Sequence, residues 1–190
     1  TLVSFAVDVA KEKDIITPEL KKEGNQLVLF TIDKDEFDLP KYDQVMTLYT
    51  AIRNLIQDGA IVSAYALDGK GLAAAVSKMA FGNKLGVTIE DEVTSDTLFA
   101  PGFGNIVEVI DAAGISDAAS VVGYVNDKQT IECDDMVLPV EDAVKVWTAK
   151  LEGVFHTKAT DDTSKVNSGL YDAKNIYVCK NKVAKPTVFI

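Results

Sequence analysis

The sequence predicts an α/β (α+β) layered domain, in which helices pack on a mixed β-sheet. Two patterns predict this class. Apolar residues recur at spacings of three and four in three long segments, and short apolar runs bounded by glycine or Asn-Asp turns lie between and after them. The 190 residues allow one good domain with an appendage, or two small domains.

Three amphipathic helices are expected, over Lys41–Asp58, Lys70–Phe81 and Val140–Leu151. Gly59 ends the first of them. Their apolar faces consist, in chain order, of Val45, Leu48, Ile52, Leu55 and Ile56; of Leu72, Val76, Met79 and Ala80; and of Val140, Ala143, Val144, Trp147 and Leu151. We interpret Trp147 as a core residue or an anchor for another domain.

Short apolar runs predict the strands of the sheet. They are Leu2–Val9, Leu27–Ile32, Ile61–Leu67, Gly86–Ile89, Asn105–Ile110, Ala119–Val125 and Thr130–Cys133. The run Thr17-Pro18-Glu19-Leu20 predicts a helical turn with Thr17 as its cap and Pro18 at the first position. The segment 157–169 is polar and is expected to be a linker, followed by two short apolar runs.

The composition excludes several classes of partner. Nineteen basic against 29 acidic side chains give a net charge of −10, which argues against nucleic acid and anionic membranes as partners. Cys133 and Cys179 are far apart and lack a metal-binding spacing, so two buried thiols in a reducing, cytoplasmic compartment are expected. The sequence contains no run of 18 apolar residues.

The most informative segment is the glycine-flanked turn that joins the strand Ile61–Leu67 to the helix at Lys70. Such a turn directs free backbone N–H groups and the positive end of a helix dipole to one point, where a phosphate group can bind. Asp68, Gly69, Lys70 and Gly71 are therefore the candidate nucleotide-binding residues. The alternative is that they are ordinary solvated turn residues.

Several stretches together resemble one protein family. They are Thr1–Val7, the segment Val62–Gly86, the pair Leu98-Phe99, and Gly104–Val107. Residues 1–155 resemble the C-terminal domain of the AIR-synthase-like superfamily, and among its members the phosphoribosylformylglycinamidine (FGAM) synthases of the large single-chain form. The segment 184–190 resembles the first strand of the glutaminase domain of those enzymes. The resemblance implies a domain at 1–155, a linker at 156–174 and a truncated glutaminase domain at 175–190.

The resemblance also implies a function. FGAM synthases are ATP- and Mg²⁺-dependent ligases that use glutamine to convert formylglycinamide ribonucleotide to the amidine in purine biosynthesis. A domain followed by a glutaminase is expected to be the second C-type domain, which contributes to an auxiliary nucleotide site that holds ATP or ADP. Its partners would be the other domains of the same polypeptide. The fragment alone is expected to be inactive and to form a non-native homodimer where its interdomain surfaces are bare.

The chain departs from the family motif at the turn. The motif reads His-Asp-x-Ser-x-Gly-Gly-Leu, and here its Asp, a Mg²⁺ ligand in relatives, falls on Ala66, which has no oxygen ligand to offer. Asp68 is a candidate substitute ligand, and Lys70 is a candidate phosphate contact. A glutamate of relatives is replaced by Pro101. These losses favour a structural scaffold domain without catalytic residues over a working nucleotide site. A domain of another superfamily member, AIR synthase or selenophosphate synthetase, is a third alternative.

Other candidate residues lead to weaker hypotheses. His156 is the only histidine, and no Ser or Cys stands at a diagnostic spacing, so a surface or domain-contact role is expected. The resemblance places the glutaminase nucleophile beyond Ile190, so Cys179 is not that residue. The acidic pair Asp134-Asp135 is expected to lie in a solvated loop.

Overall fold

A mixed β-sheet forms the centre of the computed structural model, which describes residues 2–107 and 119–156. The strands in this part of the chain are β1 (Gln26–Phe30), β2 (Tyr65–Ala66), β3 (Gly86–Ile89), β4 (Ile106–Val107), β5 (Ala119–Asn126), β6 (Thr130–Cys133) and β7 (Met136–Pro139). The helices are the 3₁₀ turn η1 (Glu12–Asp14) and α1 (Tyr42–Gln57), α2 (Gly71–Asn83), α3 (Ser95–Phe99) and α4 (Val140–Ala149).

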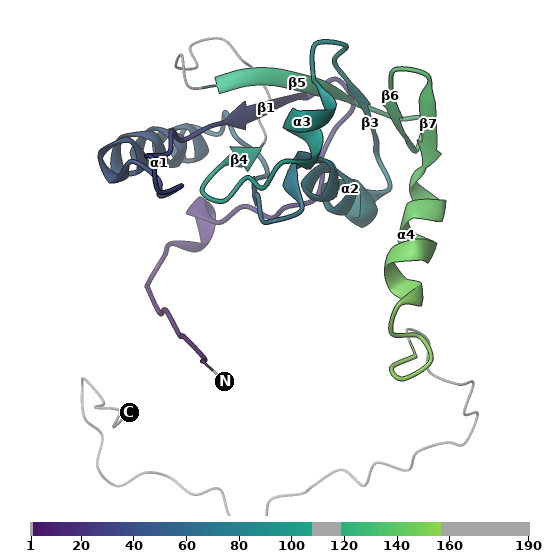
Figure 1. Ribbon diagram of the computed structural model, residues 1–190, viewed down its shortest axis with the longest axis horizontal. Helices are drawn as coiled ribbons and strands as arrows, with labels where there is room; N and C mark the ends of the chain where they lie inside the picture. The colour runs from purple at the N-terminus through teal and green to yellow at the C-terminus, as the bar shows by residue number, and fades with distance from the viewer. Residues whose placement is uncertain (1, 108–118, 157–190) are drawn as a thin grey trace, which may run out of the picture. The chain divides into compact units, whose positions relative to one another are not determined.

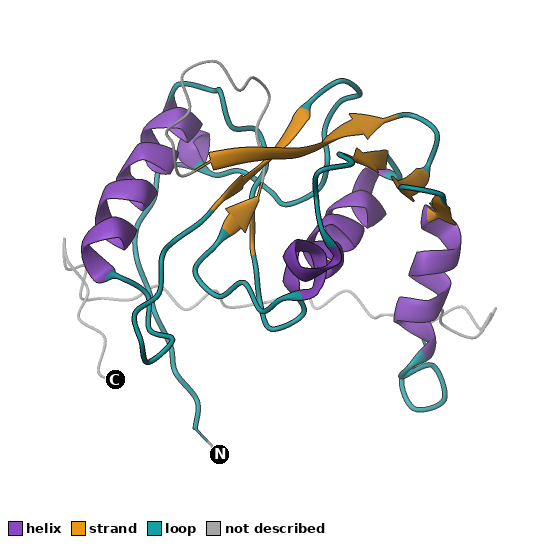
Figure 2. Cartoon of the chain, turned by 45° about the horizontal axis from the view of Figure 1, so that its top comes forward, coloured by secondary structure: helices purple, strands orange, loops and turns teal. Residues whose placement is uncertain are grey.

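The strands lie side by side in the order β2-β4-β1-β5-β3-β6-β7 (Figure 1). All neighbouring pairs are antiparallel except β3 and β6, which are parallel. Figure 2 shows the strands as one twisted layer with helices packed beside it. The predicted class, a mixed sheet with packed helices, is confirmed.

The hydrophobic core lies on both faces of the sheet, because side chains of a strand alternate between faces. On β1, Leu27 and Leu29 join the cluster around α2, whereas Val28 and Phe30 join the cluster around α1. The predicted apolar faces of the first two helices are confirmed. The α2 residues Leu72, Val76, Met79 and Ala80 are at most 1% exposed, and the α1 residues Leu48 and Ile52 are buried.

The predicted strand at Leu2–Val9 is wrong. The segment alternates apolar and small or polar residues, but it pairs with no strand in the part of the chain that the structure describes. Leu2, Val7 and Val9 are each at least 94% exposed. An alternating pattern forms a strand only where a neighbouring strand accepts its backbone hydrogen bonds, and the local sequence carries no information about that neighbour.

The helical turn predicted at Thr17–Leu20 is also wrong, because a tertiary contact takes its place. The N–H group of Leu20 donates to the carbonyl of Met79 on α2 at 3.0 Å, and the Asn83 side chain donates to the Leu20 carbonyl at 2.7 Å. Leu20 is 1% exposed. The segment is therefore fixed against α2 in a bend, and the single 3₁₀ turn of this region lies earlier, at η1.

Two elements were not predicted, and one is shorter than expected. Helix α3 begins after Thr94, whose side chain accepts the N–H of Thr97 as a helix cap. Strand β7 follows Asp134-Asp135, which form a tight β6–β7 turn with Asp134 at φ 48°. Strand β2 covers only the last part of the expected run 61–67, since β4 offers it two partners. The predicted residues 108–110 of the β4 strand lie outside the described part.

Helix α4 is confirmed over most of the predicted range, but only the first turns of its apolar face are buried. Val140 is 1% exposed, whereas Trp147 and Leu151 are about 60% exposed (59% and 61%). The Trp147 ring contacts Phe81 of α2 at a centroid distance of 5.6 Å. Trp147 therefore lies at the edge of the fold rather than in its core. Within residues 2–107 and 119–156, neither α4 nor any other helix is long and apolar enough to cross a membrane.

Candidate functional site

The predicted site residues Asp68, Gly69, Lys70 and Gly71 join β2 to the start of α2. The backbone carbonyl of Asp68 accepts two N–H groups, that of Gly71 at 3.2 Å and that of Gly102 at 3.1 Å. The first bond closes the turn, and the second joins it to the loop that precedes β4. Leu67, which is 6% exposed, anchors the start of the turn in the core, and α2 begins at Gly71.

The side chain of Asp68 folds back on the turn. Its Oδ1 accepts the backbone N–H of Lys70 at 2.8 Å, which is the geometry of an Asx turn. Its Oδ2 lies 3.7 Å from the ammonium nitrogen of Lys78. The pKa of Asp68 is lowered, chiefly by the Lys70 N–H bond and further by the charges of Lys78 and Lys70. Two of the N–H groups at the start of α2, those of Lys70 and Gly71, are thus already bonded to Asp68.

Lys78 is the residue of this site that sequence reasoning missed. It lies on the second turn of α2, and its Nζ donates to the hydroxyl of Tyr65 on β2 at 3.0 Å. The same nitrogen lies 5.4 Å from the Tyr65 ring centroid. The pKa of Lys78 is raised, first by the Tyr65 hydrogen bond and also by the Asp68 charge. Its spacing of 13 residues from Tyr65 corresponds to no local motif, so the sequence carried no signal for the contact.

Close packing surrounds the start of α2. Gly71 has φ +72°, and a Cβ atom there would lie 2.7 Å from the carbonyl oxygens of Leu98 and Ala100. At Gly69 a Cβ would meet only the Phe103 ring, at 3.4 Å. The loop 98–103 therefore covers one side of the turn, and only glycine fits at position 71.

The donor set of the turn does not fit Mg²⁺, the ion that the family resemblance implied. Ala64 packs on the α1 side of the sheet and Tyr65 on the α2 side, so the alternation of the strand places Ala66 on the face opposite to Tyr65. Asp68 bonds toward the α2 side. A carboxylate there and a ligand at position 66 would therefore point away from each other.

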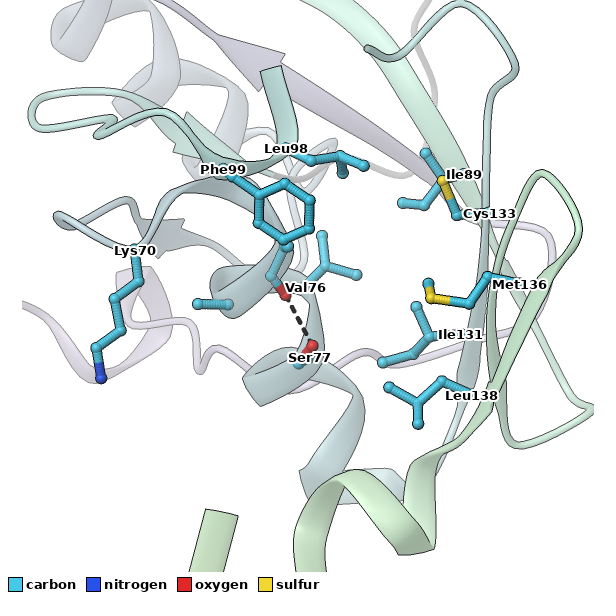
Figure 3. Close-up of a pocket in the computed structure, with 12 residues that line it drawn as sticks. Lys70, Val76, Ser77, Ile89, Leu98, Phe99, Ile131, Cys133, Met136 and Leu138 are labelled. Carbon is cyan, nitrogen blue, oxygen red and sulfur yellow. Dashed lines mark hydrogen bonds between the residues drawn. The ribbon is translucent and has the colours of Figure 1, made fainter. Parts of the chain in front are cut away.

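A pocket of about 370 Å³ lies next to the turn, between α2 and α3 on one side and the β6–β7 hairpin on the other (Figure 3). Apolar side chains make up most of its lining: Ala73, Ala74, Val76, Ile89, Leu98, Phe99, Ile131, Met136 and Leu138. Lys70 lies at the rim, and the hydroxyl of Ser77 donates to the Ala73 carbonyl at 2.7 Å. Figure 3 shows the Lys70 side chain extending away from the other lining residues. The pocket is apolar and offers no acid–base pair.

The remaining candidates do not form a reactive centre in the described part of the chain. Burial raises the pKa of Cys133, and the charges of Asp134 and Asp91 raise it further, so this pocket residue remains a neutral thiol. His156 is exposed after α4, and Cys179 lies outside the described residues. Among residues 2–107 and 119–156, no group of three or more His, Cys, Asp or Glu side chains is arranged to hold a metal ion.

Comparison with solved structures identifies the fold. The chain is similar to PurL of Thermotoga maritima complexed with AMPPCP, at a TM-score of 0.58 and 15% identity, over 70% of this chain and 27% of that one. It is similar to PurL of the same organism complexed with FGAR, at a TM-score of 0.57 and 13% identity, over 68% of this chain and 29% of that one. The chain has the AIR-synthase-like fold.

A third similar structure is PurLQS from Thermotoga maritima, at a TM-score of 0.57 and 15% identity, over 70% of this chain and 28% of that one. No family model matches the chain. The AIR-synthase-like region thus spans less than a third of the length of each of these structures. At this level of identity the likeness concerns the fold, and a shared fold does not by itself establish a shared function.

Proposed function

We propose that this chain is a domain of an ATP-dependent ligase of the FGAM synthase type, which acts in purine biosynthesis. The shared fold supports the proposal, since similar structures are named phosphoribosylformylglycinamidine synthase II and were solved with ATP, ADP and FGAR. The matched sequence stretches 1–7 and 62–86 support it independently. On this proposal, residues 1–155 are the second C-type domain, residues 156–174 a linker, and residues 175–190 the start of a glutaminase domain.

Within that enzyme we propose a structural role for the domain. The observation that carries this proposal is the position of Asp68, whose carboxylate and carbonyl accept the N–H groups of Lys70 and Gly71. A bound phosphate would have to break both bonds and would meet a carboxylate of its own charge. The domain then serves as a scaffold that joins the synthase core to the glutaminase, in the cytoplasm, and contributes no catalytic residue.

The second candidate function is a retained auxiliary nucleotide site. It is favoured by the strand–glycine–helix geometry of the turn and by Lys70, whose ammonium group forms no ion pair in the described part of the chain. In that case Lys70 would contact a phosphate as a point charge, and Gly69 and Gly71 would allow the nucleotide to approach the backbone.

Calorimetric titration of the chain with ADP separates the two functions. The structural role predicts no heat of binding at micromolar ADP, with or without Mg²⁺. The outcome that would overturn it is micromolar binding that Lys70→Ala weakens, with Lys84→Ala as the matched control on the same helix. An assay of the chain with ammonia, ATP and formylglycinamide ribonucleotide should show no turnover, and turnover would contradict the scaffold role.

A further inference from the structure

The protein's own Lys78 places a positive charge beside Asp68 at the β2–α2 turn. We infer that Lys78, through its ion pair with Asp68, keeps divalent metal ions such as Mg²⁺ from binding to the carboxylate of this turn. The inference rests on the proposed origin of the turn in a nucleotide-binding enzyme that uses Mg²⁺. It concerns a residue to which neither the family motif nor the sequence analysis assigned a role.

The acceptors around Lys78 suit an ammonium group better than a metal. Lys78 Nζ has one hydrogen bond to the Tyr65 hydroxyl, at 3.0 Å, and one carboxylate oxygen of Asp68 at 3.7 Å. A lysine ammonium group has three N–H donors and no acceptor, so a hydroxyl and a carboxylate oxygen are both suitable partners for it. Mg²⁺ requires octahedral oxygen coordination at about 2.1 Å and usually one or two carboxylates free to ligate it.

The single carboxylate of the turn is also not free. Asp68 Oδ1 is held by the N–H of Lys70 at 2.8 Å, so ligation through that oxygen would break the Asx turn. Oδ2 faces Lys78, whose side chain is 26% exposed and therefore partly shielded from solvent. A fixed positive charge within 4 Å of the only anionic ligand raises the free energy of placing a second, divalent charge beside it.

Manganese binding measured by electron paramagnetic resonance tests the inference, since bound Mn²⁺ loses the sharp signal of the free ion. The protein is the whole chain, without nucleotide, as wild type, Lys78→Glu, Lys84→Glu and Asp68→Asn. Lys84 is the exposed C-cap of α2. Its substitution gives the same change in net charge on the same helix, and thereby measures the non-specific attraction of an acidic protein for cations.

Wild type and Asp68→Asn should bind Mn²⁺ equally weakly, because Asp68 is not a ligand. Lys78→Glu should bind it at least about tenfold more tightly than Lys84→Glu, since two carboxylates then face one another across the turn. Tighter binding by wild type than by Asp68→Asn would overturn the inference. Equal affinity of Lys78→Glu and Lys84→Glu would overturn the role of Lys78.

Circular dichroism shows whether each variant is folded. Lys78→Gln, measured beside its control Lys84→Gln, separates the loss of the Lys78 charge from the gain of a new carboxylate, because it keeps a donor for Tyr65 and removes only the charge. A smaller gain in Mn²⁺ affinity over that control is then expected, and no gain would contradict the inference. Because no nucleotide is present, Mn²⁺ binding by the wild type through Asp68 would refute the inference without bearing on the ligase proposal, which the ADP titration tests.

Discussion

Asp68 accepts, with its own atoms, two of the backbone N–H groups at the β2–α2 turn, those of Lys70 and Gly71. One residue thereby closes the turn through its carbonyl, orders Lys70 through one carboxylate oxygen and pairs with Lys78 through the other. Any residue at this position would offer the same backbone carbonyl, so only the two carboxylate contacts depend on the aspartate.

Acid should destabilise the fold through Asp68 and Glu19. The pKa of Asp68 is lowered by the Lys70 N–H bond, and hydrogen bonds from Lys21 and Thr17 lower the pKa of Glu19 to about 2. A carboxyl group with a lowered pKa in the folded state contributes stability above its unfolded pKa, here 3.8 and 4.5, which is lost as pH falls through the folded value.

The urea midpoint of unfolding, measured from pH 6 to pH 2, checks this prediction. Asp68→Asn and Glu19→Gln should each lose less stability below pH 4.5 than the wild type does. Glu23→Gln, at an exposed carboxylate without an ion pair in the described part of the chain, should run parallel to wild type. A wild-type pH dependence in Asp68→Asn would show that the Lys70 bond does not lower the pKa of Asp68.

At the scale of the elements, the start of α2 depends on Gly71. Alanine at this position must adopt φ +72° and bring its Cβ within 2.7 Å of two backbone carbonyl oxygens, which cannot move without displacing α3. Gly71→Ala should therefore cost roughly 3 kcal/mol of unfolding free energy, from left-handed strain and overpacking together.

Two other glycines separate these two effects. Gly59 has φ +77° with open space around it, so Gly59→Ala should cost only the strain, about 1 kcal/mol. Gly69 has ordinary contact distances, and Gly69→Ala should be close to neutral. Chemical denaturation of the three variants gives the comparison. Equal losses of unfolding free energy at positions 59 and 71 would mean that the backbone of residues 98–100 does not crowd position 71.

The elements that the sequence predicted well are those specified by local burial. Strands β3 and β6 have the predicted bounds because each is a short apolar run between turn residues, and α1 and α2 follow their apolar periodicity closely. Strand β7 was missed because the Asp134-Asp135 pair was interpreted as a solvated loop rather than a hairpin turn. Leu2–Val9 has the alternating pattern of a strand but forms none, since pairing with a neighbouring strand depends on the tertiary structure.

The candidate site was predictable in position and not in chemistry. The glycine-flanked turn after the strand at 61–67 marks the start of α2 from the sequence alone. The hydrogen bonds that determine what the turn can bind could not be predicted, because they join residues far apart in the sequence. Lys78 reaches Tyr65 across 13 residues, and Gly102 reaches the Asp68 carbonyl across 34. Contacts between a strand, a helix and a distant loop follow from packing, which no motif at the turn encodes.

At the scale of the whole molecule, several exposed large apolar side chains follow one another on and after α4. They are Val146, Trp147, Leu151, Val154 and Phe155, each between 59% and 74% exposed. An exposed cluster of this kind normally contacts another domain or protein. It agrees with the proposal that the domain is covered by neighbours in a larger enzyme.

Self-association of the chain should therefore rise with concentration. Trp147 is the only tryptophan, so its emission reports on this surface directly. In dilute solution acrylamide should quench it readily, and protection should grow with protein concentration. Sedimentation velocity should show Val146→Lys and Leu151→Lys to be less associated than wild type, with Ile15→Lys as an exposed control outside the cluster. Association unchanged in both α4 variants would place the contact elsewhere.

Asp68 accepts two backbone N–H groups of the β2–α2 turn, those of Lys70 and Gly71, and the proposed scaffold role rests on these bonds. Amide-resolved nuclear magnetic resonance of the ¹⁵N-labelled chain, titrated with ADP and Mg²⁺, tests it most directly. The Lys70 and Gly71 amide signals should stay in place through millimolar ADP, and Asp68→Asn should shift both without ADP. Saturable shifts of these two amides at micromolar ADP in the wild type would contradict it.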